Sequence, residues 1–177
     1  GTQTELCADM NEAFSQSFTM KGVLYLMDGK TYRAVRKSSK NTAWEAVSVS
    51  GTAYVPTTTI SAAPTGGGTS YEAVNLLTPK RINTFIGDGK STEFCLDATD
   101  LDETAVTAEV NGSAVTVSAV NRSTGLVTLA AAPANGNGLA NVSIAFAKTV
   151  SGHADKINKC RFAGLYGGKN DTRVFLS

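Results

Sequence analysis

The residues from Ile86 to Thr92 read IGDGKST and contain the Gly-Lys-Ser-Thr end of a phosphate-binding loop. That loop needs a further glycine five positions before Gly89, and it opens a helix whose N-terminus faces the phosphates. Position 84 is threonine, and the following residues, STEFCLD, alternate with the period of a strand. We therefore expect no nucleotide at this stretch, and a β-hairpin turn built on Asp88-Gly89 instead.

One histidine and three cysteines are the other candidates for nucleophilic or metal chemistry. His153 is the single histidine of the chain, so a histidine-rich metal site is excluded. A catalytic dyad of His153 with Cys160 would need an orienting group and an oxyanion hole, and no motif indicates either. Cys7, Cys95 and Cys160 are far apart and odd in number, so free thiols are expected rather than a disulfide framework or a zinc knuckle.

Four carboxylates crowd the stretch LDATDLDE, at Asp97, Asp100, Asp102 and Glu103. Their spacing lacks the order of a calcium-binding loop. A glycoside hydrolase would need two of them at a defined separation, one with a raised pKa. We expect all four to be solvated in a loop. The chain is accordingly predicted to be no enzyme and to hold no cofactor and no metal.

Aromatic side chains offer a different chemistry, the stacking of sugar rings. Trp44, Tyr54 and Tyr71 could supply such rings. Aromatic residues make up only 7% of the chain, and no pair has the spacing of an obvious platform. A carbohydrate-binding module for host adsorption is therefore kept as an alternative function.

Charge and hydropathy exclude several classes of partner. The 177 residues have a formal net charge of +1 and only 18% charged side chains, which predicts no nucleic-acid surface. No apolar run approaches the length of about 20 residues that spans a membrane, and no signal peptide is visible. The chain starts at Gly1 without a methionine, which indicates either a tag remnant or an excised fragment. A strand-like run reaches Ser177, which favours a fragment of a longer protein.

The elements that would position these residues are mostly strands. Residues 4–14 predict a short helix, with Leu6 and Met10 spaced i, i+4. Turn dipeptides bound a strand at 23–27, residues 44–54 predict a strand pair broken at Gly51, and residues 159–177 predict a hairpin. Residues 55–80 contain most of the prolines and a Gly-Gly-Gly run, and are expected to be a long irregular connection.

Between residues 84 and 149 the pattern becomes regular. Five or so short strands follow one another at a spacing of roughly ten residues, each ended by a turn signal such as Asn111-Gly112, and no helical period appears. This pattern predicts an antiparallel β-sandwich or a small barrel. The fold class predicted for the whole chain is all-β.

The same stretch resembles a small Ig-like β-sandwich module of bacteriophage tail fibres and other virion proteins. The matching residues are Gly87, Asp88, Gly89, Phe94 and Leu96, then Val110, Asn111 and Gly112, then Gly125, Val127, Leu129, Ala132 and Pro133, and last Val142, Ile144 and Phe146. Ala108 replaces a usual β-branched residue, and the loop PANGNGLANV is longer than the pattern. All of these are turn and core positions, so the resemblance implies architecture and no binding site.

The flanking stretches, including SFTMKGVLYLMDGKTYRAV and VPTTTISAAPTGGGTSYEAVNLLTPKR, resemble phage or prophage structural proteins of the stabilisation or head–tail region type, with propeller-like repeats. The resemblance implies blade-like hairpins in residues 1–83 and 150–177, with residues 84–149 as an inserted module. It further implies a non-enzymatic virion protein that is made in the bacterial cytoplasm and contacts other virion proteins. A homo-oligomer is a further possible assembly that the resemblance implies.

Overall fold

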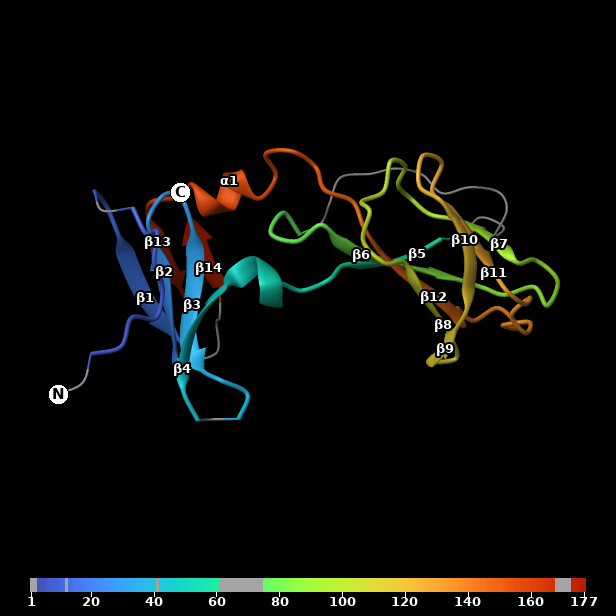
Figure 1. Cartoon of the computed structure of the whole chain (residues 1–177), viewed down its shortest axis with the longest axis horizontal. Coiled ribbons are helices and arrows are strands. Elements are labelled where there is room, and N and C mark those ends of the chain that lie inside the picture. The colour runs from blue at the N-terminus through green and yellow to red at the C-terminus, as the bar shows by residue number, and fades with distance from the viewer. Residues whose placement is uncertain (1–2, 12, 41, 61–74, 168–172) are drawn as a thin grey trace. The chain divides into compact units, whose positions relative to one another are not determined.

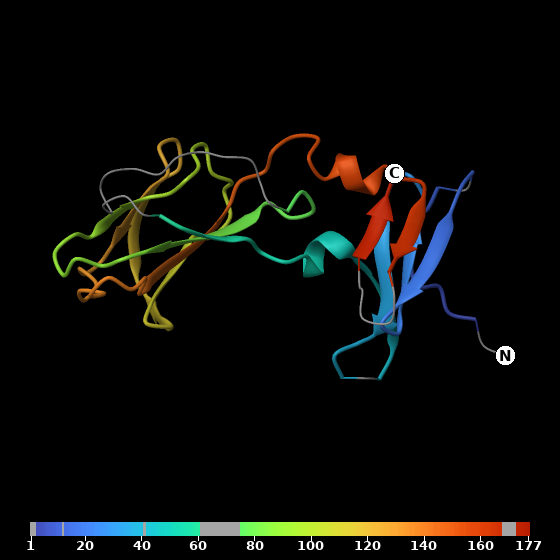
Figure 2. The same cartoon turned by 180° about the vertical axis from the view of Figure 1, so that it is seen from behind.

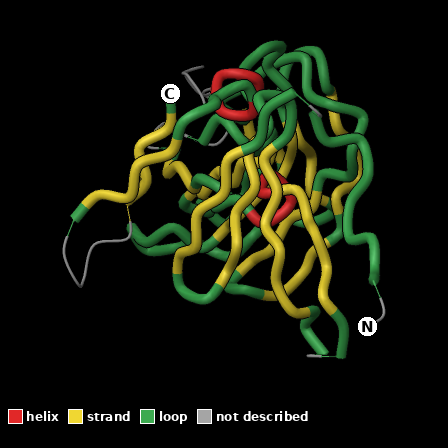
Figure 3. Tube along the Cα trace, turned by 90° about the vertical axis from the view of Figure 1, so that its left-hand side faces the viewer, coloured by secondary structure: helices red, strands yellow, loops and turns green. Residues whose placement is uncertain are grey.

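The computed structural model describes residues 3–11, 13–40, 42–60, 75–167 and 173–177. Strands dominate this part of the chain, and its helical segments are short turns (Figure 3). The all-β fold expected from the sequence is confirmed. The chain divides into two compact units, which are described one at a time below: unit 1 comprises residues 1–53, 76–78 and 151–177, and unit 2 comprises residues 54–75 and 79–150.

Unit 1 is built on a four-stranded antiparallel meander with the order β1-β2-β3-β4 (Figure 1). Its strands are β1 Gln16–Met20, β2 Val23–Met27, β3 Tyr32–Lys37 and β4 Trp44–Ser48. Lys21 and Gly22 join β1 to β2 with φ angles of 51° and 75°, the left-handed pair that a two-residue hairpin turn requires. Phe18 and Tyr25, opposite each other, stack their rings with centroids 5.0 Å apart.

The turn between β2 and β3 is organised by one buried carboxylate. Asp28 is fully buried and accepts hydrogen bonds from the backbone N–H groups of Lys30 and Thr31 and from the Thr31 hydroxyl. It also accepts a 2.7 Å bond from the backbone N–H of Asn11, whose side-chain amide donates to the Asp28 carbonyl at 3.0 Å. The N-terminal segment is thereby fastened to the hairpin.

Two expectations for unit 1 are wrong. Residues 4–11 form no helix, because the backbone N–H of Asn11, which a helix would use, is committed to Asp28. Residues 44–54 form only one strand, β4, and the chain then enters the 3₁₀ turn η1 Val49–Thr52, in which Thr52 Oγ1 donates to the Val49 carbonyl.

The C-terminal hairpin is confirmed. It consists of β13 Ala163–Tyr166 and β14 Arg173–Leu176, paired antiparallel, and the loop expected near residues 167–171 lies largely outside the described residues. The one-turn helix α1 Asp155–Asn158 precedes it. The backbone N–H of Ala163 donates to Gln16 Oε1 at 2.8 Å, which ties β13 to β1. From behind, the hairpin lies in front of the meander (Figure 2).

Unit 2 consists of two sheets around one core. One sheet has the order β5-β6-β12-β8-β9 and the other β10-β11-β7 (Figure 1). The strands are β5 Thr57–Thr59, β6 Lys80–Phe85, β7 Glu93–Cys95, β8 Thr107–Val110, β9 Ser113–Val115, β10 Val117–Asn121, β11 Leu126–Leu129 and β12 Val142–Ala147.

The alternation of apolar and polar residues in the sequence correctly predicts which side chains form the core of unit 2. Phe94 and Val127 from the smaller sheet meet Phe85, Ile144 and Phe146 from the larger one, and all five are buried. The rings of Phe85 and Phe94 meet edge to face with centroids 5.2 Å apart. Asn111 and Gly112, at φ 50° and 76°, form the expected tight turn between β8 and β9. No helix occurs between residues 84 and 150, all of which are described.

Three details of unit 2 differ from expectation. β5 lies inside the stretch expected to be irregular, and it pairs parallel to β6 although an antiparallel module was predicted. β6 runs from Lys80 to Phe85, so the expected module start at residue 84 lies within a strand. β6 and β7 belong to different sheets, so IGDGKST is not a hairpin turn but the connection that crosses between the sheets. Phe85 and Phe94 flank this connection, and each faces the shared core.

Candidate functional site

The polar groups of the Gly-Asp-Gly connection, residues 87–89, form hydrogen bonds within their own turn. Asp88 accepts hydrogen bonds from the backbone N–H groups of Lys90 and Ser91, at 2.8 and 2.7 Å, and from the Ser91 hydroxyl at 2.6 Å. The Ser91 hydroxyl and these N–H groups lower the pKa of Asp88 to about 2. The backbone donors that would cradle a phosphate are thus bound to a carboxylate of the same loop, and the segment that follows is a strand.

A second loop packs against this connection and fixes it. Asn141 Oδ1 accepts a 2.8 Å bond from the backbone N–H of Gly87, and its Nδ2 donates to the Ala134 carbonyl at 2.9 Å. The N–H of Gly136 donates to the Gly87 carbonyl at 2.9 Å. A Cβ at Gly87 would lie 2.5 Å from the Ala134 carbonyl oxygen, so the loops approach closely only because residue 87 is glycine.

The four carboxylates of LDATDLDE do not converge. Asp97 is buried, contrary to expectation. Its backbone N–H donates a hydrogen bond to the side chain of Asn83, which is itself buried. Asp102 accepts bonds from the backbone N–H and the hydroxyl of Thr149. Asp100 and Glu103 are exposed, and Glu103 pairs with Arg122 at 3.0 Å. Among the described residues no group of three metal-ligating side chains occurs.

His153 and Cys160 form no recognisable dyad. Cys160 Sγ donates to the Lys156 carbonyl at 3.2 Å, and His153 Nδ1 is buried without a hydrogen-bond partner in the described part of the chain. The three cysteines are free thiols, as expected.

The expected stacking aromatics fall in different parts of the chain. Trp44 is 56% exposed at the start of the edge strand β4, and the Lys37 ammonium lies 5.8 Å from its ring centroid. Tyr54 is 73% exposed but belongs to unit 2. Tyr71 lies outside the described residues.

Sequence reasoning missed a group of exposed apolar side chains on and next to the β13–β14 hairpin of unit 1. Tyr166 and Phe175 are 53% and 60% exposed and meet edge to face with ring centroids 5.5 Å apart. The Arg173 guanidinium lies 4.8 Å from the Tyr166 ring centroid. Leu165, next to Tyr166 in β13, and Phe162, just before β13, are exposed as well. The signal in the sequence was the absence of polar alternation in RVFL and FAGLY, which leaves apolar side chains on both faces of a two-stranded ribbon.

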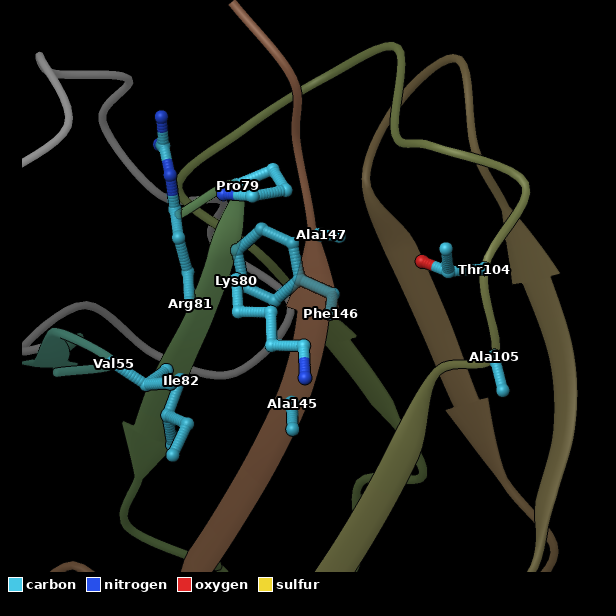
Figure 4. A pocket seen from close by; sticks show the side chains of 10 residues that line it. All are labelled: Val55, Pro79, Lys80, Arg81, Ile82, Thr104, Ala105, Ala145, Phe146 and Ala147. Atoms are coloured by element: carbon cyan, nitrogen blue, oxygen red, sulfur yellow. The ribbon is translucent and has the colours of Figure 1, made fainter. Parts of the chain in front are cut away.

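Unit 2 carries two shallow grooves. The first lies beside the start of β6 and the end of β12, and Val55, Ile82, Ala145 and Ala147 supply its apolar lining (Figure 4). Lys80, which is exposed, and Arg81, which is buried, also line it. The second groove lies beside β9 and residues 129–134 and is lined by small aliphatic side chains, among them Ala114, Val115 and Ala132.

Comparison with protein-family models, curated proteins and solved structures found no match to this chain. In the part of the chain that the structure describes, no helix has the length and hydrophobicity to cross a membrane.

Proposed function

We propose that the chain is a non-enzymatic structural protein of a bacteriophage or prophage particle, which acts through contacts with other virion proteins in the head–tail or tail assembly. The observation that carries the proposal is the exposed apolar group of the β13–β14 hairpin. The hairpin leaves aromatic side chains facing water, and exposed apolar patches of this kind mark protein contacts.

The resemblance supplies the rest of the proposal. In it, residues 84–149, which lie within unit 2, are an inserted Ig-like module, and the β1–β4 meander is a blade of a propeller-type parent. The meander has the strand count and order of one blade. Few of its side chains are buried, chiefly Met27, Tyr32, Ala34 and Val35, which suits a sheet that packs against neighbours of the same kind.

The test is immuno-electron microscopy of purified particles from an induced lysogen or a lytic infection, with an antibody raised against this chain. The proposal predicts label at a fixed site on each particle and co-purification of the protein with particles through a density gradient. Unlabelled particles, with the protein left free in the lysate, would show that it is not a virion component. Mass spectrometry of the gradient fractions gives an independent readout.

A carbohydrate-binding role in host adsorption is the second candidate, and the exposed ring of Trp44 favours it. A tryptophan face beside a lysine suits the apolar face and the hydroxyl groups of a sugar. A glycan array and a cell-wall pull-down with the whole chain test this role, with Trp44→Ala as the matched variant. Binding that is lost in Trp44→Ala would support it, and no binding by the unsubstituted chain would remove it.

A further inference from the structure

Three asparagine–glycine pairs occur in the chain, at residues 111–112, 135–136 and 137–138, and all of them lie in unit 2. Asparagine is a thermolabile residue, and a following glycine, which has no Cβ, leaves its side-chain amide open to attack by the next backbone nitrogen. We propose that the pair Asn137-Gly138 is a site of spontaneous covalent modification, at which the asparagine is converted through a succinimide to aspartate and isoaspartate. The fold protects the other two pairs. This inference goes beyond the proposed function and does not depend on it.

The reaction needs only the chain and water. The backbone nitrogen of Gly138 bonds to Cγ of Asn137 while the Cγ–Nδ2 bond breaks, and the N–H proton leaves with the amide as ammonia. Water then adds to one of the two carbonyl carbons that flank the ring nitrogen. If the bond from Cγ to that nitrogen breaks, aspartate forms. If the bond from the main-chain carbonyl carbon breaks, isoaspartate forms, whose backbone is one methylene longer. No group is oxidised or reduced.

The nitrogen of Gly138 is available for this attack. Asn137 and Gly138 are exposed, and their φ angles of 51° and 86° are those of the central residues of a type I′ turn. Within the described residues, neither the N–H of Gly138 nor the side chain of Asn137 makes a hydrogen bond. A Cβ at Gly138 would meet nothing within 4 Å, so the space around the attacking nitrogen is open.

The turn around Asn137 is also easy to open. Ring closure requires a rotation about the Cα–C bond of Asn137, which brings Cγ to the nitrogen of Gly138. One backbone hydrogen bond closes the turn, from the N–H of Leu139 to the Gly136 carbonyl at 3.0 Å. The side chain of Leu139 is 75% exposed, so little apolar contact is lost with that bond. Segments with few buried contacts open locally at a low cost in free energy.

The neighbouring pair, Asn135-Gly136, is held in place. The N–H of Gly136 donates to the Gly87 carbonyl at 2.9 Å, so the nitrogen that would attack keeps its proton in a hydrogen bond. Oδ1 of Asn135 accepts a 2.8 Å bond from the N–H of Asn137, which restrains the side-chain amide. Asn141 in turn accepts a bond from the N–H of Gly87, and so fixes the partner of Gly136.

The third pair, Asn111-Gly112, lies in a turn with similar φ angles, 50° and 76°, but this turn joins two paired strands. Rotation at Asn111 would disturb the pair of Val110 and Ser113 at the end of the β8–β9 ladder. It would also disturb the 2.8 Å bond from the N–H of Asn111 to the Asn141 carbonyl. We therefore expect this pair to react more slowly than residues 137–138 and faster than residues 135–136.

The experiment is incubation of the whole 177-residue chain in warm, mildly alkaline buffer, followed by trypsin digestion and tandem mass spectrometry. Trypsin releases residues 91–122 and 123–148, and the fragment masses show at which asparagine the amide has become an acid. An unincubated sample corrects for conversion during digestion. Conversion at Asn137 should be faster than at Asn135 by about tenfold or more, the factor that one or two net hydrogen bonds supply. Methylation by a protein isoaspartyl methyltransferase gives an independent readout of the isoaspartate.

The matched control is the same incubation in concentrated urea, where the hydrogen bonds of the fold are lost. The rates at Asn135 and Asn137 should converge there, because each asparagine is then followed by glycine in an unfolded chain. In the folded chain, Asn141→Ala should accelerate conversion at Asn135, since Gly87 is no longer fixed. Asn137→Gln, whose longer side chain would have to close a larger ring, should remove conversion at that position and leave Asn111 unchanged. Far-UV circular dichroism confirms that each variant is folded.

Three results would overturn the proposal. Equal rates at Asn135 and Asn137 in the folded chain would show that the hydrogen bonds give no protection. A difference of the same size in urea would assign the selectivity to the local sequence and not to the fold. Fastest conversion at Asn111 would place the site in the β8–β9 turn. None of these results bears on whether the protein is found in particles.

Discussion

Oδ1 of Asn141 accepts a hydrogen bond of 2.8 Å from the backbone N–H of Gly87, across 54 positions of sequence. The same side chain donates to the Ala134 carbonyl. A single amide therefore joins the loop between the two sheets of unit 2 to the loop that precedes β12. The long loop PANGNGLANV is held by this residue.

Asn141→Ala should destabilise unit 2 by about 2 kcal/mol, because two hydrogen bonds are lost and the N–H of Gly87 is left without its acceptor. Urea unfolding monitored by circular dichroism measures the change. Asn135→Ala is the control: Asn135 lies in the same loop, but its side chain accepts only a local bond from the N–H of Asn137. Equal losses in the two variants would contradict the linking role of Asn141.

Gly125→Ala should be more damaging than Gly112→Ala. Both glycines have left-handed backbone, with φ of 74° and 76°, so both variants carry a conformational cost of about 1–2 kcal/mol. A Cβ at Gly125 would in addition collide with the Ala98 carbonyl oxygen, whereas nothing lies within 4 Å of one at Gly112. We expect an extra loss of about 1–3 kcal/mol for Gly125→Ala. Thermal or urea unfolding of the pair gives the difference, and similar values would refute the close approach.

Asp28 should make the N-terminal part of unit 1 sensitive to acid. Burial alone would raise its pKa, but the hydrogen bonds from Thr31, Asn11 and Lys30 outweigh it and lower the pKa below its ordinary value of 3.8. Because the folded-state pKa is depressed, the stabilisation is complete above pH 3.8 and is lost as the pH falls through the lowered value. Hydrogen exchange at the amides of Asn11, Lys30 and Thr31 should accelerate in that range.

Asp28→Asn is the matched variant for this acid response. The amide cannot ionise, so exchange at the same three positions should no longer change with pH in this window after correction for the intrinsic rate. An unchanged acid response in Asp28→Asn would assign it to another carboxylate.

The carboxylate of Asp88 should titrate near pH 2, and the titration should depend on Ser91. The Ser91 hydroxyl and the backbone N–H groups of Ser91 and Lys90 stabilise the charged form. Ser91→Ala removes the hydroxyl donor and should raise the pKa towards 3.8, as followed by carbon-detected NMR of the side chain. Ser123→Ala, which deletes a hydroxyl bonded to Asn121, should leave the Asp88 titration where it is. A midpoint near 3.8 in the unsubstituted chain would show that the turn does not form in solution.

The sequence predicts unit 2 better than unit 1 for a physical reason. In unit 2 one face of each strand is buried, so alternation at Phe94, Val127 and Ile144 reports the core directly. In unit 1 few side chains are buried, so apolar alternation carries less information. The helix expected at residues 4–14 is absent from residues 4–11. The backbone N–H of Asn11 there bonds to Asp28, which is distant in sequence, and a local pattern cannot show such a bond.

The candidate sites were harder to predict than the fold. The sequence correctly predicts that a strand, and not a helix, follows IGDGKST, and that the first glycine of a phosphate loop is missing. It could not show that β6 and β7 lie in different sheets, because strand pairing depends on residues far apart in the sequence. The burial of Asp97 depends on Asn83, fourteen positions earlier. Exposure of Tyr166 and Phe175 is likewise a property of what packs beside the hairpin, which no local pattern contains.

Val55 and Ala147 line the same groove of unit 2, and the N–H of Lys148 donates to the Pro79 carbonyl at 2.9 Å. The polypeptide thus enters and leaves the sandwich at a single end. A module with adjacent ends can be exchanged, deleted or circularly permuted as one piece, since joining its ends needs only a short linker. For unit 2 the piece would be residues 54–150, which include the short stretch 76–78 that belongs to unit 1.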